Sequence, residues 1–235
     1  MLAAVLANVL HTDLIHLITT FIQQPLRLIN TSLPGTLFIY SFGNFLFTLG
    51  IHQSVVNSVI LEPFLLINTN ENMIAFTNGQ PIPHIINNIF VPTFGMIGGT
   101  GSTISLLIAI FVFARQKSSK QVARLSLAPG LFNINEPVIF GLPIVFNLPL
   151  MIPFVLLPAI GIYFAWLCTT LGLMSRCVVM IPWTTPPILS AWLATAGDWR
   201  AVVVQLAIIV FGVFFYLPFL KIAERVALKN SAIAE

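Results

Sequence analysis

The sequence predicts an all-α fold, that of a polytopic helical membrane protein with about four to five transmembrane helices plus re-entrant hairpins. Of its 235 residues, 57% are hydrophobic and only 7% are charged, whereas roughly a quarter of the residues of a soluble domain are charged. A helical crossing takes about 20 apolar residues, so the chain has material for several spans. Its 10 basic residues are spread along the chain and form no stripe of the kind that binds nucleic acid.

Four stretches contain no charged residue over a length that can cross a bilayer: residues 33–51, 91–114, 138–173 and 201–220. The third is too long for one helix. It also contains four prolines, each of which removes a backbone donor and disturbs the preceding turn. We therefore expect a short half-helix followed by one full crossing. A further uncharged run, residues 177–197, has three prolines in its first half, which favours a broken or re-entrant element.

The basic residues predict the orientation of the spans. They form two groups, one after the second stretch and one after the last: Arg115, Lys117, Lys120 and Arg124, then Lys221, Arg225 and Lys229. The positive-inside rule places both groups, and with them the C-terminus, in the cytoplasm. An even number of predicted crossings lies between the two groups, so charge and topology agree.

This pattern divides the chain into three parts. We expect residues 1–32 to hold the end of a truncated leading helix and an interfacial helix that stops before Pro25, residues 33–220 to form the transmembrane transport domain, and residues 221–235 to form a cytoplasmic tail. Residues 52–88 are too polar to lie in lipid. That segment must face water or fold back into the protein around a cavity.

Glu136 is the only charged residue between positions 125 and 175, and it lies between Asn135 and Pro137. An ionised carboxylate at the centre of a bilayer costs at least about 2.5 kcal/mol, so it requires a partner or a watery site. One interpretation is that Glu136 caps a half-helix near the membrane interface. The other is that it lies at a helix break inside the protein, where it accepts hydrogen bonds from the hydroxyl groups of a ligand.

His52 ends the first uncharged stretch and is followed by three more polar residues up to Asn57, with only apolar residues between them. A histidine at the end of a span is often interfacial or satisfied by its neighbours. A group of polar side chains at membrane depth instead suggests a hydrophilic guest. Both interpretations remain open from the residues alone.

Two further motifs contain glycine or tryptophan. The glycine-rich run at residues 95–103 lacks the Lys-Ser/Thr ending of a phosphate-binding loop and no strand precedes it, so close helix approach or unwound backbone beside a cavity is favoured. Trp183 lies in the proline-rich run. It is either an interfacial belt residue or a flat apolar face on which a sugar ring can stack.

Taken together, these motifs resemble those of the lactose/cellobiose/diacetylchitobiose family of bacterial phosphotransferase-system permeases, the membrane (IIC) components of sugar uptake systems. The resemblance extends over nearly the whole chain, and several independent motifs occur in family order. They are Gly50-Ile-His52, Gly98-Gly-Thr-Gly-Ser102, Asn135-Glu-Pro137, Phe140-Gly-Leu-Pro-Ile-Val-Phe-Asn147 and Pro182-Trp-Thr-Thr-Pro-Pro187.

The resemblance implies a function in the bacterial inner membrane. In this family the IIC component binds a β-linked disaccharide from outside and presents it at the cytoplasmic face, where a phosphocysteine of the partner IIB protein phosphorylates a sugar hydroxyl. Glu136 then corresponds to the carboxylate that binds this hydroxyl, as a catalytic base or only as an orienting group, and His52 contacts the same sugar. Asn135, Asn57 and Trp183 are secondary candidates for substrate binding by their neighbourhood.

The chain itself is expected to need no metal and no organic cofactor, because the phosphoryl group arrives on the partner. Whether the chain is an enzyme in its own right therefore stays open. Family members are longer and have an N-terminal half that forms the homodimer interface. This chain resembles their C-terminal, substrate-binding half, which is expected to move in an elevator-like manner. Two other functions remain open: an inactive half-permease kept as a structural remnant, and a proton or ion carrier that uses Glu136 and His52 as a relay.

Overall fold

The computed structural model describes residues 24–142 and 144–234, and within these residues all regular structure is helical. The all-α class predicted from the sequence is therefore confirmed. In chain order the elements are α3 (Gln24–Thr31), α4 (Leu33–Thr48), α5 (Ser54–Val56), the π-helical turn η2 (Asn57–Leu61), α6 (Glu62–Thr77), α7 (Phe90–Gly95), α8 (Thr103–Phe113), α9 (Lys117–Leu131), α10 (Glu136–Gly141), α11 (Leu148–Thr170), α12 (Leu189–Ala194) and α13 (Trp199–Ala234).

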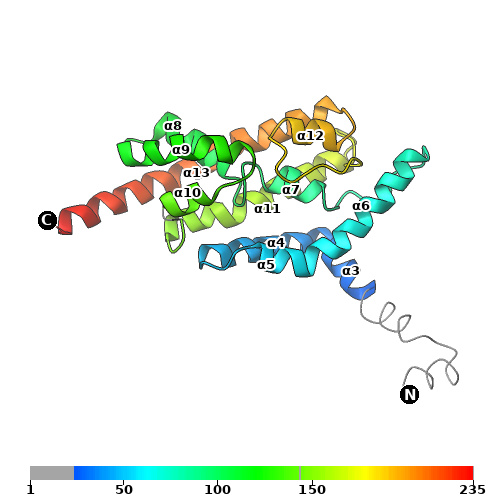
Figure 1. Ribbon diagram of the computed structural model, residues 1–235, viewed down its shortest axis with the longest axis horizontal. Coiled ribbons are helices and arrows are strands. Elements are labelled where there is room, and N and C mark those ends of the chain that lie inside the picture. The colour runs from blue at the N-terminus through cyan, green and yellow to red at the C-terminus, as the bar shows by residue number, and fades with distance from the viewer. Residues whose placement is uncertain (1–23, 143, 235) are drawn as a thin grey trace, which may run out of the picture.

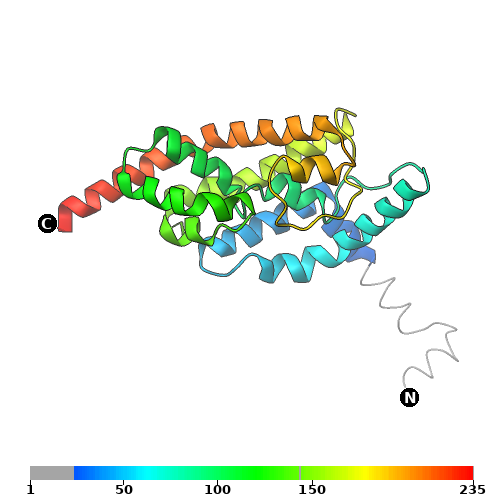
Figure 2. The ribbon, with the colours of Figure 1, turned by 45° about the horizontal axis from the view of Figure 1, so that its top comes forward.

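Helices α11 and α13 are at the centre of the helix packing. They pack against each other, and α13 runs along the long axis to the C-terminal tip (Figure 1). Helix α8 packs against α13, whereas α4 packs against α11 (Figure 2). Consequently α11 lies between α4 and α13, and segments far apart in the sequence meet around its middle.

Among the described residues, two helices are long and apolar enough to cross a bilayer: α11 and the part of α13 up to Val226. The count of four to five spans stays a prediction. Residues 91–114, which the sequence predicts as one crossing, do not form a continuous helix. They are divided between α7 and α8, because Gly98, Gly99 and Gly101 have φ angles of +76°, +101° and +79°. Only glycine adopts such angles readily, so the chain turns there.

The third uncharged stretch is divided as predicted, into the short helix α10 and the full-length helix α11. Helix α11 begins at a cap in which the side-chain oxygen of Asn147 accepts a hydrogen bond from the Leu150 N–H at 3.4 Å. Pro149 lies in the first turn, where its missing donor is not needed. Pro153 and Pro158 lie inside α11 without ending it, although neither has a backbone N–H to donate.

The other sequence predictions are met in part. Residues 177–197 contain only the short helix α12 between irregular segments, in agreement with a broken element. Helix α13 continues through the predicted boundary after residue 220, so residues 221–234 extend the last helix. The predicted interfacial helix before Pro25 lies almost entirely outside the described residues, which begin with α3.

Small residues allow the helices to approach closely. A Cβ on Gly161 of α11 would lie 2.5 Å from the backbone oxygen of Phe94 in α7, and a Cβ on Gly212 of α13 would lie 2.5 Å from the Ser105 hydroxyl in α8. That hydroxyl donates a hydrogen bond to the backbone oxygen of Ile209 at 3.1 Å. Small side chains and interhelical hydrogen bonds of this kind hold membrane helices together. They hold α7 against α11 and α8 against α13, and residues of α7 line a cavity.

Candidate functional site

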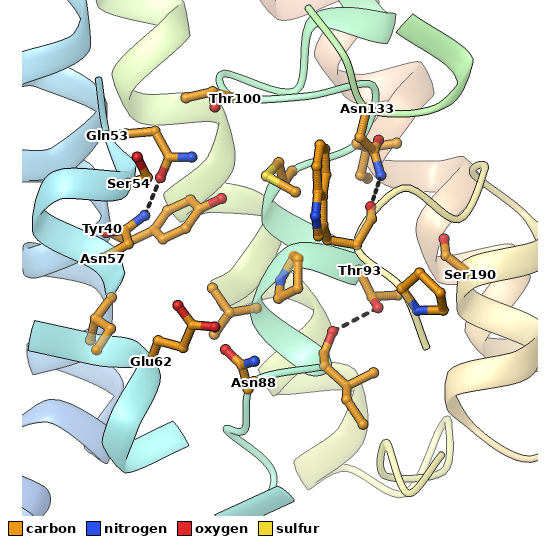
Figure 3. A pocket seen from close by; sticks show the side chains of 18 of the residues that line it. Tyr40, Gln53, Ser54, Asn57, Glu62, Asn88, Thr93, Thr100, Asn133 and Ser190 are labelled. Atoms are coloured by element: carbon orange, nitrogen blue, oxygen red, sulfur yellow. Dashed lines mark hydrogen bonds between the residues drawn. The ribbon is translucent and has the colours of Figure 1, made fainter. Parts of the chain in front are cut away.

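A cavity of about 520 Å³ lies between α4–α6 on one side and α7 with the loops before α10 and α12 on the other (Figure 3). Small-molecule sites have volumes of roughly 300–1,000 Å³. All five site residues predicted from the sequence line this cavity: His52, Asn57, Asn135, Glu136 and Trp183. They come from three separate parts of the chain, so the fold brings together the motifs that carry the family resemblance.

Asn133 connects the loops that form one wall of the cavity. Its side-chain oxygen accepts a hydrogen bond from the Gly98 N–H at 2.8 Å, and its side-chain nitrogen donates to the backbone oxygen of Trp183 at 2.5 Å. Its φ angle of 62° lies in the left-handed region, which asparagine tolerates better than most residues. One amide thus holds the glycine loop, the loop before α10 and the Trp183 segment in a fixed arrangement.

Asn135 provides a second connection in this wall. It is 3% exposed, and its side-chain nitrogen donates to the backbone oxygen of Thr100 at 2.6 Å and to the Thr103 hydroxyl at 3.2 Å. A Cβ on Gly99 would lie 2.5 Å from the Asn135 Cγ, so the two loops touch. Glu136 follows directly as the first residue of α10, so Asn135 anchors the backbone from which this carboxylate extends.

Glu136 and His52 both line the cavity and approach each other there. The His52 Nε2 lies 3.9 Å from the Glu136 Oε1, and the two side chains are 46% and 48% exposed. The Ser54 N–H donates to the His52 Nδ1 at 3.2 Å. Since a backbone N–H can only donate, Nδ1 must accept, and we assign the proton of the neutral imidazole to Nε2. The Phe47 ring packs on the imidazole with a centroid distance of 4.5 Å.

This geometry bears on both interpretations of Glu136. The residue does begin a short helix, as a cap near an interface would, but it also lines the cavity. A separation of 3.9 Å is too long for a direct hydrogen bond to His52. The pair therefore presents one donor and one acceptor that a small polar group can satisfy together.

Asn57 lines the same side of the cavity as His52. Its side-chain nitrogen donates to the side-chain oxygen of Gln53, whereas its own side-chain oxygen is buried and has no hydrogen-bond partner among the described residues. Gly43 of α4 leaves room for this oxygen, since a Cβ there would lie 3.0 Å from it. Trp183 lies on the opposite wall and is 56% exposed.

Several cavity residues were not singled out from the sequence. The most notable are Tyr40 in α4, Glu62 at the start of α6, and Asn88 before α7 (Figure 3). One sequence signal for Glu62 existed, because Ser54, Ser58 and Glu62 recur every four residues and so share one helix face. The prediction that residues 52–88 surround a cavity did not identify the individual side chains.

The carboxylates of the described chain fall into two classes. Three accept hydrogen bonds from other residues: Glu71 from Arg27 at 2.8 Å, Asp198 from Arg200 at 2.9 Å, and Glu224 from the Arg115 N–H at 3.1 Å. The two in the cavity, Glu62 and Glu136, accept none from any described residue. The cavity therefore holds the carboxylates that remain free to bind a ligand.

Comparison with known proteins identifies the family. Residues 1–158 match the family "Phosphotransferase system, EIIC". The chain is 33% identical over 216 residues to the lichenan permease IIC component of Bacillus subtilis (strain 168), which covers 92% of this chain and 48% of the relative. It is 33% identical over 243 residues to the PTS system cellobiose-specific EIIC component of Lactococcus lactis subsp. lactis (strain IL1403). That match covers 94% of this chain and 49% of the relative.

The fold also matches a solved structure, that of the transporter ChbC, the IIC component from the N,N'-diacetylchitobiose-specific phosphotransferase system. The TM-score is 0.91 at 31% sequence identity, and the match covers 98% of this chain and 54% of that chain. The chain spans about half the length of the curated relatives it matches. The resemblance inferred from the motifs is thus confirmed, and the chain belongs to the EIIC family of the phosphotransferase system, the membrane permease components of the cellobiose, lactose and chitobiose type.

Proposed function

We propose that this chain forms the sugar-binding part of a phosphotransferase-system permease that takes up a β-linked disaccharide. The observation that carries the proposal is the pairing of His52 and Glu136, which lie 3.9 Å apart in the lining of a cavity of about 520 Å³. A sugar has apolar ring faces and a rim of hydroxyl groups. A mostly apolar cavity with a few convergent polar groups suits such a ligand.

A sugar hydroxyl placed between the two residues satisfies both. It accepts a hydrogen bond from the His52 Nε2–H and donates its own proton to the Glu136 carboxylate. At the cytoplasmic face, the oxygen of this hydroxyl attacks the phosphorus of a phosphocysteine on the IIB partner. The O–P bond forms, the S–P bond breaks, the cysteine leaves as a thiolate, and Glu136 orients the hydroxyl and is placed to take up its proton.

The wall built from the loops supports this role mechanically. Asn133 and Asn135 hold the loop before α10 against the glycine loop, so the carboxylate keeps its place while the sugar is exchanged. We further propose that the cavity moves between the two faces of the membrane together with these elements, as a body, against the remainder of the permease.

Sugar binding by the protein in lipid nanodiscs tests the proposal. Cellobiose, lactose and diacetylchitobiose are titrated into the wild-type protein and into Glu136→Gln, with Glu224→Gln as the matched control, because Glu224 contacts the α8–α9 connection. A hydrogen bond to a charged group contributes about 1.5–3 kcal/mol. We therefore expect Glu136→Gln to weaken binding of the preferred disaccharide by roughly 10- to 150-fold, and Glu224→Gln to leave it unchanged.

Two outcomes contradict the proposal in different ways. If no disaccharide binds at millimolar concentration, the chain is better described as an inactive remnant. If liposomes that contain the protein conduct protons without a phosphorylated partner, and Glu136→Gln abolishes that flux but not sugar binding, the His52–Glu136 pair serves as a proton relay.

A further inference from the structure

The cavity has a second polar region, on the wall formed by α4 and α5–α6. Glu62, the first residue of α6, directs its carboxylate into the cavity, and Asn88 lies beside it (Figure 3). The Tyr40 hydroxyl of α4 points into the same space (Figure 3). None of these three residues belongs to the motifs that carry the family resemblance.

Tyr40 and Glu62 both lack a partner within the protein. Tyr40 is 4% exposed, and its hydroxyl has no hydrogen-bond partner in the described part of the chain. No hydrogen bond or ion pair from residues 24–142 or 144–234 reaches the Glu62 carboxylate. Buried polar groups are nearly always paired, so an unpaired hydroxyl directed into a cavity indicates a ligand that supplies the missing partner.

The chemistry of the two side chains matches the rim of a sugar ring. An ionised carboxylate only accepts hydrogen bonds, and a tyrosine hydroxyl donates one and accepts others. Each hydroxyl group of a sugar can do both. The two side chains together can therefore bind neighbouring hydroxyl groups of one ring.

Glu62 is too far from His52 to act on the same ring, whereas Tyr40 lies between them, beside Ser54 and Asn57 (Figure 3). Ser54, which hydrogen-bonds His52, and Glu62 are eight residues apart on one helical segment. At about 1.5 Å per residue this is a rise of about 12 Å, slightly less across the π-helical turn η2. One sugar ring does not contact both ends of such a segment, but two linked rings do.

We propose that Tyr40 and Glu62 form a second subsite that binds the other ring of the disaccharide and makes the protein prefer disaccharides over monosaccharides. This inference rests on the proposed function, in which the first ring lies between His52 and Glu136. It assigns selection for two rings to α4 and α6 and the chemistry of phosphorylation to the loop before α10.

The test compares dissociation constants for the preferred disaccharide and for the monosaccharides that it contains, measured by calorimetry in nanodiscs. Glu62→Gln and Tyr40→Phe are compared with matched controls outside the cavity, Glu224→Gln and Tyr163→Phe, the latter from an exposed residue of α11. We expect each cavity variant to lose roughly tenfold or more in disaccharide affinity. Monosaccharide affinity should stay within twofold of wild type, which also shows that the variants are folded.

The outcomes separate this inference from the proposed function. If the wild-type protein binds no sugar, the proposed function fails and the second subsite with it. If the wild-type protein prefers the disaccharide and Glu62→Gln and Tyr40→Phe keep the full preference, only the second subsite is overturned. An equal loss of affinity for monosaccharides and disaccharides also overturns the second subsite, because both residues would then act on the first ring.

Discussion

Gly99→Ala tests how firmly the glycine loop positions Glu136. At Gly99, φ is +101° and an added Cβ would lie 2.5 Å from the Asn135 Cγ. Positive φ costs an L-residue about 1–2 kcal/mol. Displacing Asn135 also breaks its hydrogen bonds to Thr100 and Thr103, and an unsatisfied buried amide costs about 1–3 kcal/mol. We therefore expect a total destabilisation of about 2–5 kcal/mol.

Gly172→Ala is the matched control. Gly172 has a φ of +73°, but nothing lies within 4 Å of an added Cβ, so this variant carries the backbone strain of about 1–2 kcal/mol without the clash. Thermal unfolding in detergent, followed by circular dichroism, measures both, at about 2–4 °C per kcal/mol for a chain of this size. Gly99→Ala should unfold at a lower temperature than Gly172→Ala and should alone weaken disaccharide binding. Equal unfolding temperatures with intact binding would refute the argument that Asn135 holds the two loops together.

Three further variants test separate parts of the structure. Trp183→Ala should weaken sugar binding by up to roughly tenfold in titrations. It should not lower the unfolding temperature, because the Trp183 backbone and not its ring accepts the hydrogen bond from the loop before α10. An unchanged affinity would show that the ring does not contact the sugar. Asn44→Leu should keep or raise the unfolding temperature, since Asn44 is fully buried and neither of its amide atoms has a partner in the described chain; a clear loss would reveal a partner for this amide. Burial raises the pKa of the Asp198 carboxyl, but hydrogen bonds from Arg200 and from the Ser175 N–H outweigh it and hold the pKa well below its usual range. The stabilisation from this lowered pKa is present above the ordinary aspartate pKa of about 3.9 and is lost as the pH falls towards the folded-state value. We therefore expect Asp198→Asn to flatten the decline of the unfolding temperature between about pH 5 and pH 2. An unaltered decline would contradict the assignment of these hydrogen bonds as the cause.

Much of the helical architecture could be predicted from the sequence because its signals are local. Hydropathy finds long apolar helices such as α11, and the proline-rich region before it predicts the division from α10. Glu136 could be placed at a helix break because Pro137 favours the first turn of a helix. These signals depend on a few neighbouring residues and need no knowledge of packing.

The division of residues 91–114 into α7 and α8 was predicted only as one of two roles for the glycine-rich run, because hydropathy reports the cost of transfer into lipid and not the backbone angles. The glycines were visible, but glycine also occurs within continuous membrane helices. At Gly98 the turn also depends on tertiary structure, because its N–H donates to the side-chain oxygen of Asn133, 35 residues away. Tyr40 and Glu62 were missed for a related reason, since the lack of a partner is a property of the folded cavity.

The two walls of the cavity differ in how their polar groups are satisfied. On the loop wall, the side-chain nitrogens of Asn133 and Asn135 donate to backbone oxygens. By contrast, the cavity residues Tyr40 and Asn57, on α4 and η2, each have one buried side-chain oxygen without a partner among the described residues. A satisfied network is rigid, whereas unpaired groups gain most from a ligand. The loop wall is therefore suited to hold the reacting hydroxyl in place, and the α4–α6 wall is suited to distinguish one sugar from another.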